Sequence, residues 1–211
     1  MESKKLLIIL VLIVLIGGGL IYYYQNGFSF PFLEENTPAE ENTPDGNNGT
    51  EEPEEEADTV LERNSFSILL PAGWKEIVSP EGISLMIIKN QEEFSDLKVK
   101  DIGFQSYVAV SLGDSKEKTW EEYIDFTRES VLGMLGQDSR ISSEGDATIN
   151  GKQAYTMDFE ATYGGVELKG QVVIVKAEGT NVWGMSFNTT KDKWEGYKDV
   201  FSRVAESFEI K

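Results

Sequence analysis

Apolar and polar residues follow three different patterns along this chain, and each pattern predicts a different kind of structure. Residues 6–24 carry no charge and read LLIILVLIVLIGGGLIYYY. As a helix they would be about 28 Å long, which matches a hydrocarbon core of about 30 Å, so we expect a transmembrane anchor. In residues 25–58 Pro, Asn, Gly and Glu take over, which predicts a disordered acidic linker. Apolar runs then recur from residue 59 to residue 211 and predict one folded domain.

Short apolar runs bounded by turn residues predict the strands of this domain. We expect strands at residues 66–70, 83–89, 107–112, 147–150, 154–163, 166–177 and 182–188. The last four are separated by Asn150-Gly151, Gly164-Gly165 and Glu178-Gly179. Such short turns make consecutive strands antiparallel neighbours.

Two stretches have the spacing of a helix that buries one face. Thr119 and Glu122 have the spacing of a capping box, and the stripe that follows is Trp120, Tyr123, Ile124, Val131 and Leu135. Asp192 is the expected cap of a second helix, whose stripe is Trp194, Tyr197, Phe201, Val204 and Phe208. The order strands, helix, hairpins, helix predicts an α+β domain with one antiparallel sheet covered by helices.

Three segments of this domain carry a family resemblance. FSILLPAGW (residues 66–74), INGKQAYTMDFEA (149–161) and WEGYKDVFSRVAESF (194–208) resemble the PsbP-like family. That family includes the extrinsic photosystem II subunit and many exported bacterial proteins. The resemblance implies an antiparallel sheet sandwiched by helices and a protein-docking module. The absence of histidine, and the apolar segment in place of a thylakoid-targeting peptide, argue against a photosystem role.

The charges around the apolar segment predict its orientation. Lys4 and Lys5 precede it, and the next basic residue is Arg63. By the positive-inside rule, residues 1–5 stay in the cytoplasm and the domain is exported, which predicts a single-pass protein of the cell membrane. A cleaved signal peptide, cut near the glycines at 17–19, remains the alternative. A lipoprotein is excluded because the chain has no cysteine.

Composition narrows the chemistry. The chain lacks cysteine and histidine, so its own residues form neither a Ser-His-Asp nor a Cys-His centre, nor the usual zinc and copper sites. The net charge is −18, and residues 33–58 hold eleven acidic residues and no basic one. This acidity argues against nucleic-acid binding and against direct docking on anionic lipid.

Oxygen ligands remain available for calcium. Asp138, Glu144 and Asp146 surround an expected loop and are the candidate metal ligands, with weak affinity expected because no closed geometry is evident. Calcium-dependent binding therefore stays open as a function. Two N-x-S/T sequons occur, at Asn48 and Asn188, and matter only in a host that glycosylates them.

Paired carboxylates offer a catalytic alternative. Asp158 and Glu160 share one face of an expected strand, and Lys169 is placed to pair with them across the hairpin. Two carboxylates can act as acid and base, as an extracytoplasmic hydrolase would require. Our preferred interpretation is a non-catalytic binding or scaffold module, without a cofactor, whose partner is another envelope protein. The four tryptophans are expected to pack in the core.

Overall fold

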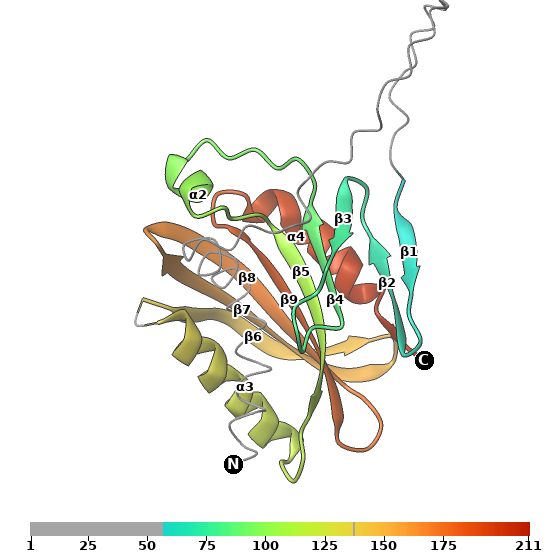
Figure 1. Cartoon of the computed structure of the whole chain (residues 1–211). Helices are drawn as coiled ribbons and strands as arrows, with labels where there is room; N and C mark the ends of the chain where they lie inside the picture. Colours follow the sequence, from blue (N-terminus) through green and yellow to red (C-terminus); the bar gives the residue numbers. More distant parts are fainter. Residues whose placement is uncertain (1–56, 137) are drawn as a thin grey trace, which may run out of the picture.

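The computed structural model describes residues 57–136 and 138–211 (Figure 1). The expected cytoplasmic terminus, the anchor at 6–24 and the linker up to residue 56 lie outside the described residues. Within the described part, no helix combines the length and the apolar character needed to cross a bilayer. At the start of this part, Asp58 accepts a 2.9 Å hydrogen bond from the Ala72 backbone N–H and pairs with Arg203. The folded unit therefore includes one residue that the sequence assigned to the linker.

A seven-stranded antiparallel sheet forms the centre of the domain, with the order β3-β4-β5-β9-β8-β7-β6. Its strands are β3 (Trp74–Ile77), β4 (Leu85–Lys89), β5 (Tyr107–Asp114), β6 (Arg140–Ile149), β7 (Lys152–Tyr163), β8 (Val166–Lys176) and β9 (Asn181–Thr190). The expected hairpins after β6, β7 and β8 are confirmed. Asn150 and Gly151 have φ values of 45° and 75°, as a two-residue turn between β6 and β7 requires.

A second, three-stranded sheet corrects the prediction of a single sheet. It consists of β1 (Thr59–Glu62), β2 (Phe66–Leu70) and β10 (Glu209–Ile210), in the order β1-β2-β10. The turn at residues 71–73, with Gly73 at φ 72°, ends β2 and starts β3 in the other sheet. A two-residue strand such as β10 has no hydrophobic period of its own, so the sequence pattern does not reveal it.

Three helices of the described part complete the layers: α2 (Leu97–Asp101), α3 (Trp120–Leu135) and α4 (Trp194–Glu206). Helix α4 and the small sheet cover one face of the central sheet, whereas α2 and α3 cover the other (Figure 1). The capping box of α3 is confirmed, since Thr119 and Glu122 bond to each other's backbone N–H groups. The cap expected for α4 is wrong: Lys193 is the N-cap residue and makes no side-chain cap bond, and Asp192 is exposed.

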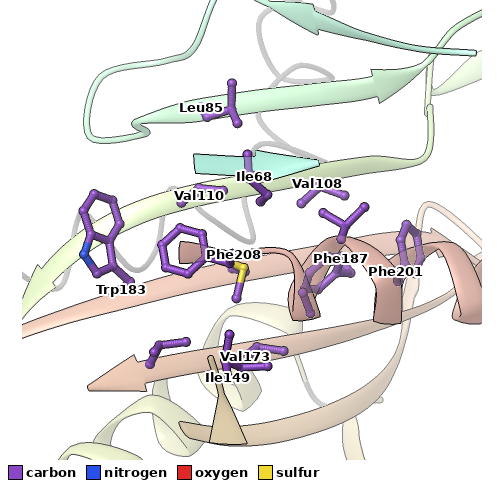
Figure 2. Close-up of a cluster of buried hydrophobic side chains, with 14 of the residues drawn as sticks. Ile68, Leu85, Val108, Val110, Ile149, Val173, Trp183, Phe187, Phe201 and Phe208 are labelled. Carbon is purple, nitrogen blue, oxygen red and sulfur yellow. The ribbon is translucent and has the colours of Figure 1, made fainter. Parts of the chain in front are cut away.

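The largest core cluster lies between the central sheet and α4. It brings together aromatic rings from both sheets and from the helix region, among them Trp183, Phe187, Phe201 and Phe208 (Figure 2). Trp74 is 6% exposed, and its ring meets those of Tyr197 and Phe201 edge-on, with centroids 5.8 and 5.9 Å away. All four tryptophans are buried, so the core role predicted for them is confirmed.

Candidate functional site

A hollow of about 940 Å³ opens to solvent at one end of the central sheet. Three parts of the chain line it: residues 92–95 after β4, Lys100 of α2 with residues 103–105 before β5, and residues 192–193 before α4. The rings of Phe94 and Phe104 are buried there and meet edge-on at 6.1 Å. The ammonium group of Lys193 lies 4.6 Å from the centre of the Phe94 ring. The hollow therefore combines an apolar floor with a charged rim.

A buried carboxylate braces the inner side of this hollow. The side chain of Glu92 is only 1% exposed. It accepts hydrogen bonds from the Ser106 backbone N–H at 2.6 Å, the Ser106 hydroxyl at 2.8 Å and the Tyr197 hydroxyl at 2.8 Å. Lys193 Nζ lies 3.7 Å away. A buried carboxylate is tolerated only with such compensation, so these contacts tie together the segments after β4, before β5 and in α4.

The hydroxyl groups of this network have defined roles. Ser106 and Thr189 share a 2.7 Å hydrogen bond, and because the single Ser106 hydroxyl hydrogen goes to Glu92, Thr189 donates to Ser106. Burial, with the neighbouring Glu92 carboxylate, raises the pKa of the Tyr197 phenol, which keeps it protonated as a donor. The network has a structural role, because its polar groups form hydrogen bonds with one another.

The candidate calcium ligands are placed differently from the expectation. Glu144 and Asp146 lie within strand β6, not around a loop, because β6 begins at Arg140 rather than at residue 147. Apart from Ile141, its residues 140–146 are polar or glycine and carry no apolar alternation that would reveal a strand. Glu144 is bound to Arg128 Nε at 2.9 Å, while Asp138 and Asp146 are exposed. Among the described residues, no group of three or more acidic side chains is close enough to hold a metal ion.

The proposed catalytic carboxylates are engaged in structural contacts. Asp158 accepts a 2.8 Å hydrogen bond from Gln171, and Glu160 pairs with Arg140 at 2.8 Å and Lys191 at 3.3 Å. These two cations, Arg140 foremost, lower the pKa of Glu160. A general acid needs the opposite shift, so Glu160 is not suited to donate a proton.

The predicted partner of these carboxylates, Lys169, lies elsewhere. It stands opposite Glu160 in the strand register, but its ammonium group lies 4.9 Å from the centre of the Trp194 ring. A cation over an aromatic face is itself a favourable arrangement, and it takes the place of the expected ion pair.

Two features of the structure were not apparent in the sequence. Glu92 and Glu93 are adjacent acidic residues after a strand, yet the side chain of Glu92 is buried whereas Glu93 is exposed. The sequon at Asn188 is 6% exposed and donates to Ser186 Oγ at 2.7 Å, so it is inaccessible to a modifying enzyme in the folded domain. Neither fact has a local sequence signal.

Comparison with known proteins now defines the class of the domain. An α+β architecture of antiparallel sheets and three helices agrees with the family model for PsbP, which matches residues 59–210. The chain therefore belongs to the PsbP family, as the three segments above indicated. No curated protein sequence matches it.

Solved structures share this fold at low sequence identity. LpqN of Mycobacterium tuberculosis, described as involved in cell envelope biogenesis, has a TM-score of 0.56 and 13% identity, covering 72% of this chain and 90% of LpqN. Cyanobacterial PsbP (CyanoP) of Synechocystis has a TM-score of 0.53 and 15% identity, covering 79% of this chain and 98% of CyanoP. The Ran-binding protein Mog1p of Saccharomyces cerevisiae has a TM-score of 0.52 and 12% identity, covering 74% of this chain and 96% of Mog1p. These likenesses establish the fold.

Proposed function

We propose that this chain is a binding module anchored in the membrane and held outside the cytoplasm by residues 6–24. Its domain binds another envelope protein in the hollow beside Glu92. The observation that carries the proposal is the hollow itself. It is concave and wide-mouthed, has two aromatic rings as its floor and lies against a braced corner of the fold. A recess held in shape by buried bonds loses little entropy when a partner binds.

The polar groups around the hollow favour binding over catalysis. The carboxylate closest to its inner wall, Glu92, already accepts three hydrogen bonds and is shielded from solvent. Lys193 Nζ donates to the Glu93 carbonyl at 2.7 Å and so serves to close the corner. Exposed Glu93, Lys100 and Asp192 remain at the rim, where charges of both signs give orientation and specificity to a protein partner.

The relatives support a docking role through their described activities. Mog1p is a Ran-binding protein, and LpqN is involved in cell envelope biogenesis. A fold of this kind therefore serves as a platform for a protein partner in at least one case. Placement in the envelope is inferred from Lys4 and Lys5 before the apolar segment, since no further basic residue occurs before Arg63.

Site-specific photo-crosslinking in intact membranes tests the docking site. A photoreactive residue replaces Gln105 or Ser95, which are exposed and line the hollow; the control position is exposed Glu178, in the turn after β8 at the opposite end of the sheet (Figure 1). We expect one discrete adduct with an envelope protein from positions 95 and 105 and none from 178. Equal labelling from all three positions, or none from 95 and 105, would remove the hollow as the docking site.

Protease accessibility tests the orientation separately. Protease added to intact cells, or to protoplasts where an outer barrier exists, should remove residues 33–211. The positive-inside rule gives this outcome because the only basic residues near the apolar segment precede it. Protection that is lost only after lysis would place the domain in the cytoplasm and contradict the proposed location.

A further inference from the structure

Strand β6 is the long open edge of the central sheet. It has ten residues, whereas the strand at the other edge, β3, has four. Within the described part of the chain, β6 pairs with β7 alone. Backbone N–H and C=O groups on its outer side therefore have no strand partner there, which makes the edge a template for a further strand.

The regular part of this edge has two chemically distinct sides. After the irregularity between Ile141 and Ser143, the register runs unbroken from Ser143 to Ile149. Glu144 and Asp146 stand opposite Met157 and Tyr155, which pack on the α3 side of the sheet. The alternate residues Ser143, Gly145 and Ala147 are small and lie on the α4 side. An added strand would meet carboxylates on one side and small side chains on the other.

The acidic side is only partly neutralised. Arg128 of α3 binds Glu144 at 2.9 Å but also pairs with Asp125, so one guanidinium serves two carboxylates. These two carboxylates raise the pKa of Arg128, which stays charged. Asp146 is exposed, and no cation among the described residues lies within ion-pair distance of it. The edge therefore carries net negative charge beside its open backbone groups.

We propose that β6 accepts an extended segment of a partner protein whose side chains are basic at every second residue. Such a segment adds an eighth, outer strand and places its Lys or Arg side chains opposite Glu144 and Asp146. The same acids disfavour a second copy of this chain. Two β6 strands paired antiparallel about Gly145 would set Glu144 directly opposite Asp146, and like charges in that position repel.

A synthetic peptide tests the proposal on the full chain in detergent. The probe is a labelled decapeptide of alternating lysine and threonine, and its affinity is measured by fluorescence anisotropy. The variant Asp146→Lys reverses the exposed charge on β6, and Glu178→Lys makes the same charge change in the distant turn after β8. We expect the first to weaken binding about tenfold and the second less than about twofold. Equal losses, or no binding by the unaltered chain, would overturn the proposal.

Backbone methylation separates strand addition from general charge attraction. Two further probes carry N-methyl groups either on the odd or on the even backbone nitrogens of the same peptide. Only one set of N–H groups faces β6 in an added strand, so one probe should lose binding and the other should keep it. Similar binding by both probes would contradict strand addition. Sedimentation provides the remaining outcome: dimers of the unaltered chain that vanish in Asp146→Lys would make a second copy the occupant and overturn the proposal.

Neither result depends on the hollow. The crosslinks from positions 95 and 105 concern the opposite half of the sheet, near α2, whereas β6 lies beside α3 (Figure 1). Failure of the peptide experiment therefore leaves the docking site at the hollow in place, and failure of the crosslinks leaves the edge proposal in place.

Discussion

The Glu92 corner and the β6 edge use the same chemical group for opposite purposes. At the corner, Glu92 is shielded from solvent and accepts three hydrogen bonds from Ser106 and Tyr197. At the edge, Asp146 is exposed on a strand with an open side. A buried carboxylate is costly to leave unpaired and so fixes the elements that satisfy it. An exposed one adds little stability and instead influences which partner approaches.

This difference predicts how the two regions respond to substitution. Changes at the corner should alter the free energy of unfolding, and changes at the edge should alter partner affinity alone. Unfolding is measured throughout by urea titration of the full chain in detergent.

The largest effect is expected at Trp74, which supports the corner from the core side. Its ring meets the Tyr197 ring, whose hydroxyl bonds to Glu92. Trp74→Ala should lower the free energy of unfolding by about 3–5 kcal/mol, because a large aromatic side chain leaves a cavity. Val78→Ala is the control: Val78 is 84% exposed, and its loss should cost less than about 0.5 kcal/mol. A cost below about 1 kcal/mol for Trp74→Ala would show that the ring does not support the core.

The next effect is expected at Glu92 itself. Glu92→Leu leaves the Ser106 N–H, the Ser106 hydroxyl and the Tyr197 hydroxyl without their acceptor, and should cost about 3 kcal/mol or more. The adjacent, exposed Glu93 provides a matched control, because Glu93→Leu keeps the backbone carbonyl that accepts from Lys193. Equal losses in the free energy of unfolding from the two variants would refute the distinction between the buried, structural Glu92 and the exposed Glu93.

Tyr197 gives a pH-dependent test of the same network. Its pKa is raised by burial and by Glu92, so the unfolded state releases the phenol proton first, near pH 10. Stability is thus fully present below about pH 10 and declines as the pH rises further. Tyr197→Phe should cost about 1–2 kcal/mol at neutral pH and reduce the alkaline decline.

Part of that decline belongs to another tyrosine. Burial raises the pKa of Tyr123 to about 12, so its contribution has the same sign and remains in Tyr197→Phe. The double variant with Tyr123→Phe should flatten the alkaline profile further. An unchanged profile in both variants would mean that neither phenol titrates differently on unfolding.

The smallest change in stability is expected at the edge. Asp146→Asn removes an exposed charge without a described ion-pair partner, and should alter the free energy of unfolding by less than about 0.5 kcal/mol. The same variant should still weaken binding of the alternating lysine peptide. A destabilisation comparable to that of Glu92→Leu would give Asp146 a structural role and contradict the proposed difference between the two regions.

Much of the fold could be predicted because its signals are local. The hairpins after β6, β7 and β8 follow from turn dipeptides, and α3 from its capping box and apolar stripe. The three-stranded sheet was missed because β1 and β10 are short, and because β10 pairs with β2 through contacts distant in sequence. The start of β6 was missed because an edge strand with polar residues has no apolar alternation.

The candidate site was less accessible to sequence reasoning. Asp158, Glu160 and Lys169 were correctly placed in one hairpin, yet the partners of Glu160 and Lys169 come from β6, the residue after β9, and α4. Glu92 gained its role from Ser106, fourteen positions on, and Tyr197, more than a hundred positions on. Tertiary contacts of this kind decide which of several acidic residues becomes buried, and local patterns do not encode them.

Native-state amide hydrogen exchange compares the two regions most directly. The Ser106 amide, bonded to Glu92, should exchange only through global unfolding. In β6, the amides that face away from β7 should exchange at least about a hundredfold faster, while the alternate amides bonded to β7 serve as an internal control. The alternating lysine peptide should slow the outward set and leave Ser106 unchanged. Fast exchange at Ser106, or slow exchange of the outward β6 amides without a partner, would contradict a closed corner and an open edge.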